Sequence, residues 1–448
     1  MAGTTRFRRR MLAATLGAAL VTSLAACGGS SANQDQGDGK LAGDVTFWSS
    51  YTQGPRAEWL QKMADKFEAE NPDVHITIEN FSWGEFYTKW TAGVASGQLP
   101  DISSALPYHV TEMLDAGVIA PLDDVIDEIG RDRFPESALK EGAKDGHNYS
   151  IPLYSHAQAM WIRKDVLEEN GLEVPETWEE LRDAAKKVST PDLYGLSVPL
   201  GTNDVQGVRY LNYYVKSAGG SLITEDGKAN LTSPEALEGI KYWVDLYNEV
   251  SPKGSINFNI LDQATLYYQG KTAFDFNTGF QIGGVQATTP SLDDKIEAAP
   301  LPRLHKGDPI YGAETGYQPM VVWETSDVQE EAKAFLLSLY NDEDYIEFLK
   351  GVPIGMMPVL KDIAENPEFR DDPEIQKHIE SFDVINQAIP LSSAIGMENG
   401  PRIEAGILVN QGVVESMFQD IILNGTDINT AAKNAEDQLN KMFEQARR

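Results

Sequence analysis

The sequence has little cysteine and little positive charge. Cys27 is its only cysteine among 448 residues, so an internal disulfide is excluded, as is a zinc or iron–sulfur site built on several cysteines. Lysine and arginine number 37 against 68 aspartates and glutamates, a formal charge of −31. Partners with many phosphates need clustered Lys and Arg, and the first ten residues hold the only such cluster. We therefore expect no nucleic-acid partner.

Catalytic motifs are also lacking. The six histidines form no H-E-x-x-H pair, and G-x-S-x-G and G-x-G-x-x-G are absent. Residues 270–272 (GKT) resemble the end of a P-loop, but Thr265 stands where the loop requires glycine. The many carboxylate pairs follow from the acidic composition, and the separation that marks a glycosidase cannot be read from a sequence. We expect no cofactor, no metal and no enzymatic activity, with a secreted carbohydrate-active enzyme as the alternative.

The one long apolar run lies at the N-terminus. Four arginines between positions 6 and 10 precede the apolar residues 11–24, and the stretch ends in small residues, as a secretory signal does. Cys27 follows Leu24-Ala25-Ala26, which resembles the lipobox of bacterial lipoproteins, where the signal is cut before the cysteine and the cysteine is acylated. No later run approaches the roughly 18 residues that span a bilayer. The prediction is a signal peptide over 1–26 and a protein held at the outer face of the cell membrane by lipid on Cys27.

Length and pattern predict more than one domain. At roughly 150 residues per domain, the chain has room for two or three. Residues 27–43 contain Gly, Ser and charged residues and few that could anchor a core, which predicts a flexible leash. From residue 44, short apolar runs alternate with amphipathic stretches: a strand over 45–48, a helix over 57–69 and a strand over 74–78. This alternation predicts an α/β fold with mixed sheets covered by helices.

Two further helices are predicted from their N-caps. Thr177 with Glu180 three residues later predicts a helix over 178–188, and Ser233 before Pro234 predicts one over 234–249. The other predicted elements are helices over 86–95, 110–115, 122–129, 328–339, 345–349, 403–423 and 430–446, and strands over 149–153, 157–162 and 273–276.

Aromatic, amide and hydroxyl side chains gather at the ends of predicted strands, where ligands bind in open α/β sheets. Flat aromatic faces beside neutral polar groups suit a polyhydroxylated ligand. Core or loop packing is the alternative role for each residue taken singly. The candidates at strand ends are Trp48, Ser50, Tyr51, Gln53, Tyr154, His156, Asn277, Phe280, Glu314 and Tyr317, and Trp83 joins them.

Several segments, in order along the chain, match a known family. They are SGQLPDI at 96–102, GVIAPLD at 117–123, AGG at 218–220 with DGK at 226–228, SPEA at 233–236 and QGKTA at 269–273. The most specific stretch runs from YSIPL at 149–153 through Trp161 and RKD at 163–165 to PETWEEL at 175–181. The chain thus resembles the sugar-type extracellular solute-binding proteins of bacterial ABC importers, a family that includes maltose-binding proteins.

The resemblance implies a two-lobed, type II periplasmic-binding-protein-like fold, in which each lobe is a helix-covered mixed sheet and a hinged cleft lies between. We expect lobe 1 over 44–153 plus about 303–350 and lobe 2 over 154–302 plus 351–448. The crossings near 153–154, 300–303 and 350–352 should act as hinges. A monomer that delivers a mono- or oligosaccharide to ABC permease subunits follows from the same resemblance.

The resemblance adds Tyr108 and His109 to the candidates. They stand where maltose-binding relatives often place charged side chains that bind the sugar. His156 stands where these relatives place an acidic side chain that binds the sugar. Phe280 stands where they carry an aromatic ring that stacks on the sugar. These differences leave the identity of the sugar open. Glycerol phosphate or another small polar solute is the alternative ligand, for which Arg209 and Lys216 could serve, although the expected position of each is on the solvated surface.

Overall fold

The computed structural model describes residues 40–52, 54–81, 83–202 and 204–447. The predicted signal peptide, Cys27, nearly all of the leash, and Gln53 lie outside these ranges. Within them, no helix is both long enough and apolar enough to cross a membrane.

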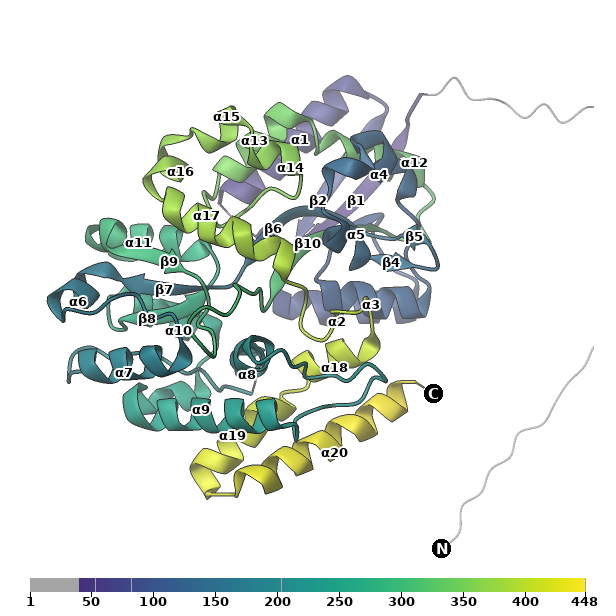
Figure 1. Cartoon of the computed structure of the whole chain (residues 1–448). Coiled ribbons are helices and arrows are strands. Elements are labelled where there is room, and N and C mark those ends of the chain that lie inside the picture. Colours follow the sequence, from purple (N-terminus) through teal and green to yellow (C-terminus); the bar gives the residue numbers. More distant parts are fainter. Residues whose placement is uncertain (1–39, 53, 82, 203, 448) are drawn as a thin grey trace, which may run out of the picture. The chain divides into compact units, whose positions relative to one another are not determined.

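A five-stranded mixed sheet forms the first half of the fold (Figure 1). Its order is β2-β1-β3-β10-β6, in which β1 runs parallel to β2 and β3, and β10 runs antiparallel to β3 and β6. The strands are β1 (Gly43–Ser49), β2 (Val74–Asn80), β3 (Ile102–Ser104), β6 (Ile151–Ala157) and β10 (Thr315–Val322). The predicted strand–helix–strand start of the fold is confirmed.

An antiparallel sheet of order β8-β7-β9 forms the second half. Its strands are β7 (Ala159–Arg163), β8 (Phe274–Asn277) and β9 (Ile296–Ala299), and a small β4–β5 hairpin (Ala143–Lys144 and His147–Asn148) stands apart. Gln158 alone separates β6 from β7, so the chain passes between the sheets in one residue. The predicted lobe limit at 153–154 therefore falls inside β6, while the segment 300–314 joins β9 to β10.

The amphipathic pattern of α1 (Pro55–Glu70) explains how helices cover the first sheet. Trp59, Leu60, Met63 and Phe67 recur at helical spacing and are all buried, which places one apolar face against the sheet. The helices on this side are α2 (Trp83–Ser96), α3 (Pro107–Ala116), α4 (Asp123–Ile129), α5 (Glu136–Lys140), α12 (Gln329–Ser338) and α13 (Asp342–Lys350). Shorter helices follow: α14 (Lys361–Ala364), α15 (Pro367–Arg370), α16 (Pro373–Lys377) and α17 (Ile379–Ala388).

Both predicted N-caps are present in the helices around the second sheet. Thr177 Oγ1 accepts from the Glu180 amide at 3.2 Å, and Ser233 Oγ accepts from the Ala236 amide at 3.2 Å. The helices of this half are α6 (Lys164–Glu169), α7 (Trp178–Val188), α8 (Gln206–Ser217), α9 (Pro234–Val250), α10 (Ile260–Tyr268), α11 (Phe280–Thr288), α18 (Ile403–Asn410), α19 (Val413–Asn424) and α20 (Ile428–Ala446). In Figure 1, α7, α8 and α9 gather with α18–α20 below the second sheet.

The single helix predicted over 403–423 is wrong, because the chain breaks there into α18 and α19. Gly412 adopts φ 62°, the left-handed region that side chains disfavour. A Cβ at this position would come 2.6 Å from the carbonyl oxygen of Thr202. Asn410-Gln411-Gly412 interrupts the apolar residues at the break, and a glycine at such a point is a helix-ending signal that the sequence prediction did not use.

Candidate functional site

A cavity of about 370 Å³ is lined by residues from both halves of the fold. The first half contributes the start of α3 and parts of β6 and β10, and the second contributes α8, α10 and the segment from β8 into α11. This volume lies in the range of small-molecule sites, roughly 300–1,000 Å³. Four aromatic rings line it: Tyr108, Tyr268, Phe280 and Tyr317.

A hollow of about 530 Å³ beside α1 and β2 is lined by acidic side chains and by no phenylalanine, tyrosine or tryptophan. Two still larger hollows are also less suited to a small solute. One of about 610 Å³ lies along α7 and residues 300–306, and charged side chains but no aromatic rings line it. The other, of about 690 Å³, shares Leu106, Val205, Val409 and Asn410 with the cavity and continues it outward. The aromatic cavity is thus the candidate site.

The end of β8 delivers two candidates to the cavity. Asn277 is the last residue of β8, and Phe280 is the first of α11 after the turn at Thr278-Gly279. A Cβ on Gly279 would come 2.1 Å from the carbonyl oxygen of Ile354, so only glycine fits this turn. Phe280 is partly buried, and its ring meets that of His156 edge-on at 6.3 Å between centroids.

The structure brings together six of the predicted site residues. Lining the cavity are Tyr108, His156, Asn277, Phe280, Glu314 and Tyr317. Their arrival at one place from distant parts of the sequence supports the view that strand ends carry the site, while a contact of any of them with ligand stays a prediction.

The other described candidates do not line this cavity. Trp48 is buried near Phe81, Tyr51 is fully buried against Phe348, and His109 stacks on Phe86 with centroids 6.1 Å apart. The buried Ser50 donates its amide to Ser104, and Tyr154 Oη lies 3.3 Å from the Gln318 side-chain oxygen. Gln53 is outside the described residues, and only the backbone of Trp83 is described. Their roles in binding also remain predictions.

Sequence reasoning did not select five polar residues of the cavity, which are Gln158, Arg209, Thr278, Gln318 and Asn410. Gln158 crosses between the sheets and accepts from Tyr213 Oη at 3.1 Å, and Gln318 donates to the Ala105 carbonyl at 2.6 Å. Arg209 was considered only for an anionic ligand, with a solvated surface position as its expected role. It is buried instead, because α8, which the hydrophobic pattern did not predict, packs between α9 and α19.

Arg209 and Glu314 form a buried ion pair in the cavity wall. Arg209 Nη2 donates to Glu314 Oε1 at 3.0 Å, Nε also donates to this carboxylate, and the side chains are only 11% and 8% exposed. Burial alone would lower the pKa of Arg209, but Glu314 outweighs it and raises that pKa, so the guanidinium stays charged. The pair sets donors and acceptors side by side, as hydroxyl groups require.

His156 adds a neutral polar group to the same wall. Burial, together with the charges of Arg209 and Arg56, lowers the pKa of His156 to about 4. Its Nδ1 atom is buried and has no hydrogen-bond partner among the described residues. At neutral pH this ring can donate from one nitrogen and accept at the other.

A chain of buried amides and a carboxyl supports the wall behind Phe280. Gln263 Nε2 donates to Asp275 Oδ1 at 2.6 Å, Gln281 donates to Asp275 Oδ2, and all three residues are fully buried. Burial raises the pKa of Asp275 to about 7, above its usual value of 3.8.

Replacing Asp275 by asparagine should flatten the pH dependence of stability. Between pH 3.8 and about 7 the folded protein keeps the Asp275 proton that the unfolded chain has released, so this group makes stability fall as pH rises. The stability of the wild type minus that of Asp275→Asn should therefore fall with pH, at most by about 1.4 kcal/mol per unit. Urea unfolding of both proteins from about pH 5 to pH 7 measures this, and a constant difference would contradict it.

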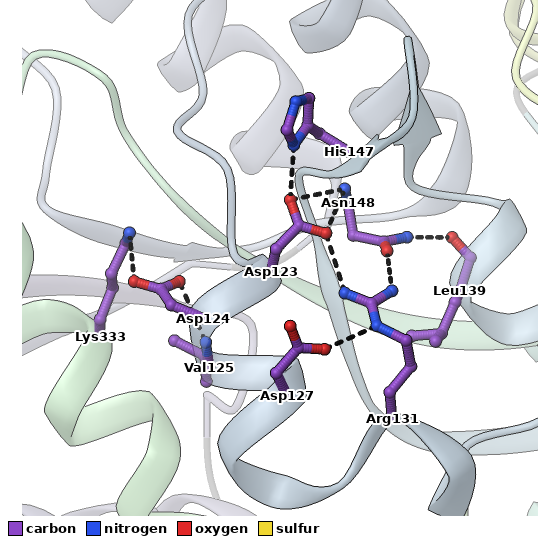
Figure 2. Close-up of polar contacts among 9 residues, drawn as sticks. All are labelled: Asp123, Asp124, Val125, Asp127, Arg131, Leu139, His147, Asn148 and Lys333. Carbon is purple, nitrogen blue, oxygen red and sulfur yellow. Dashed lines mark hydrogen bonds and ion pairs between the residues drawn. The ribbon is translucent and has the colours of Figure 1, made fainter.

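A second group of charged side chains lies on α4 and the β4–β5 hairpin (Figure 2). Arg131 donates to Asp127 at 2.7 Å, to Asp123 at 2.9 Å and to Asn148 Oδ1 at 2.6 Å, and His147 Nδ1 lies 3.0 Å from Asp123. No group of His, Cys, Asp or Glu in the described parts of the chain could hold a metal ion. These contacts tie the hairpin to α4, and none of the five residues lines the cavity.

Comparisons with known proteins agree with this architecture. The family described as bacterial extracellular solute-binding protein matches residues 52–346. A binding protein of Brucella abortus (strain 2308) is 26% identical over 329 residues, 72% of this chain and 78% of that one. The maltotriose-binding protein of Pyrococcus abyssi is 23% identical over 385 residues, 85% and 78% of the two chains.

A solved structure shows the same fold. The ABC transporter solute-binding protein of Thermotoga lettingae bound with α-D-tagatose superposes with a TM-score of 0.74, at 22% identity, over 89% of this chain and 99% of that chain. The predicted two-lobed, type II periplasmic-binding-protein-like fold is confirmed. Because the family match covers more than half of its residues, the chain belongs to the bacterial extracellular solute-binding protein family.

Proposed function

We propose that this protein is a lipid-anchored extracytoplasmic receptor that captures a sugar, mono- or oligosaccharide, and delivers it to the permease of an ABC importer. The observation that carries the proposal is the cavity between the two sheets, where aromatic rings stand beside the Arg209–Glu314 pair. Relatives that bind maltotriose and tagatose support a sugar as the ligand class.

The cavity lining matches the chemistry of a sugar. The C–H face of a sugar ring packs on flat aromatic surfaces, and the partly exposed ring of Phe280 offers one in the cavity wall. Its hydroxyls both donate and accept, and the Arg209–Glu314 pair offers both functions within one side-chain contact. A cavity of about 370 Å³ extended by the outer hollow suits a small sugar with room for a second unit.

Calorimetric titration against a ligand panel tests the proposal. The panel holds neutral mono- and disaccharides, sugar alcohols, sugar acids, glycerol phosphate and sugar phosphates. We expect saturable binding of at least one sugar or sugar derivative without its conversion. Binding of glycerol phosphate alone would favour the alternative ligand, and turnover of any oligosaccharide on prolonged incubation would establish an enzyme instead.

Replacing Cys27 by serine should release the protein from the membrane or stall its processing. The thiol is the acylation point of a lipobox, and no other cysteine could take its place. Fractionation with fatty-acid labelling measures the outcome, and the matched control is Ser30→Ala in the leash. Normal labelling and full membrane retention of Cys27→Ser would contradict the anchor.

Ligand binding should also close the cleft. The segments that cross between the sheets, at Gln158 and over 300–314, would absorb the change in backbone dihedral angles, as hinges do. Small-angle scattering should show a smaller radius of gyration with saturating ligand. An unchanged radius, with binding verified in the same sample, would mean that the solute enters a preformed cavity.

A further inference from the structure

Among the described residues, one arginine beside the cavity has no carboxylate partner. Arg56 is the second residue of α1, and its guanidinium carbon lies 5.0 Å from the Tyr51 ring centroid and 5.6 Å from that of Phe280. Its Nη1 donates to Tyr154 Oη at 3.3 Å. Within the described parts of the chain no acidic side chain forms an ion pair with Arg56, although acidic residues outnumber basic ones 68 to 37.

The contacts of Arg56 lead to the cavity wall. Phe280, which it faces, lines the cavity, and Tyr154 passes a hydrogen bond on to Gln318, which also lines it. The His156 ring lies 6.3 Å from both the Tyr154 and the Phe280 ring. The charge of Arg56 thus acts at the part of the wall where His156 has a buried, unpartnered nitrogen.

The local backbone adds to this positive charge. The first turns of α1 and α11 meet where Arg56 faces Phe280, and neither N-terminus has a side-chain cap. Helix N-termini carry a partial positive charge of about half a unit. Arg209, the arginine that lines the cavity, is neutralised by Glu314, whereas Arg56, which lies against Phe280, has no acidic partner among the described residues.

We propose that the captured solute is a sugar acid. Its single carboxylate binds beside His156, where the positive charge of Arg56 stabilises it. This inference rests on the proposed function and specifies its ligand class. One unpaired arginine balances one carboxylate, whereas a phosphate monoester with a charge of about −1.5 to −2 would leave excess negative charge. The neutral His156 can donate the N–H of Nε2, the ring nitrogen that is not buried, to the carboxylate, and the Arg209–Glu314 pair remains for the hydroxyls.

A structural role for Arg56 makes a different prediction. If its guanidinium only joins α1 to α11 through the rings of Tyr51 and Phe280, its loss would weaken the binding of charged and neutral ligands alike. Ligand charge therefore separates the two roles.

The test compares sugar acids with their neutral parents. Calorimetry on the wild type, Arg56→Gln and Arg56→Lys uses D-glucuronate, D-galacturonate, D-glucose, D-galactose and glucose 6-phosphate. We expect one acid to bind about tenfold or more tightly than its parent, this preference to vanish in Arg56→Gln, and part of it to return in Arg56→Lys. The matched control is Arg370→Gln, because Arg370 also lies over a phenylalanine, Phe382, at 5.1 Å, but Phe382, unlike Phe280, does not line the cavity.

Other outcomes overturn the inference in distinguishable ways. Binding of the neutral sugars without preference for the acids, or equal weakening of both by Arg56→Gln, would leave the proposed function standing and refute the sugar acid. Tighter binding of the phosphate would do the same. Failure of every sugar and sugar derivative to bind wild-type protein whose folding is verified by its melting would overturn both proposals.

Discussion

Replacing Glu314 by alanine should lower the free energy of unfolding by about 3–5 kcal/mol, because it leaves the charge of Arg209 buried without a partner. Both side chains are nearly inaccessible, and Arg209 makes two hydrogen bonds to this carboxylate. Sugar binding should be lost as well, since the acceptor pair in the cavity wall disappears. Urea unfolding measures the first effect and calorimetry the second.

A double variant separates the charge from the packing. Replacing a buried ion pair by apolar residues of similar volume is often close to neutral for stability, so Arg209→Met with Glu314→Leu should recover most of the lost stability. It should not recover binding, because no donor or acceptor is restored. An unfolding curve of Glu314→Ala that matches the wild type would show that the pair contributes nothing to the folded state.

Replacing Phe280 by alanine should weaken sugar binding by about 1–3 kcal/mol, with little change in the melting temperature of the ligand-free protein. Phe280 begins α11 and is partly buried, with one part of its ring in the cavity wall. A sugar ring that packs on it would lose that apolar contact. Calorimetry and thermal melting are measured on the same preparation.

Phe276, four residues earlier, is the matched control. It is fully buried, and its ring contacts those of Trp178, Tyr210 and Trp243. Phe276→Ala should therefore cost about 3–5 kcal/mol of stability, as a large cavity in a core does. If Phe280→Ala instead melts far lower while the folded fraction binds sugar normally, Phe280 belongs to the core and the site assignment is wrong.

Local sequence signals predicted the elements that lead to the cavity. The N-caps Thr177 and Ser233 marked the starts of α7 and α9, because a cap depends on residues only three positions apart. The end of β8 at Asn277 and the turn before Phe280 were likewise predicted, since Thr278-Gly279 interrupts an apolar run. Residues at strand ends, including Glu314 and Tyr317, were thereby selected as candidates, and the cavity contains them.

The burial and the partners of residues were not predicted where their neighbours come from distant segments of the sequence. Arg209 meets Glu314 across 105 positions of sequence, so its burial and its partner depend on how α8 packs and not on nearby residues. Trp48 lies near the end of β1 and Tyr51 follows that strand, as a site residue should, yet both side chains turn into the core of the first half. The break at Gly412 was not predicted either, and there the Thr202 carbonyl leaves no room for a side chain.

The sequence by itself determined the family, the α/β alternation and the positions of about half of the helices and strands, because these depend on periodicity, caps and short motifs. Only the tertiary structure decided which strand-end residues share one cavity, that Arg209 is paired and Arg56 is not, and that His156 is neutral. Those properties arise from burial and from charges brought within a few ångströms by the packing of the two halves, and no local pattern records either.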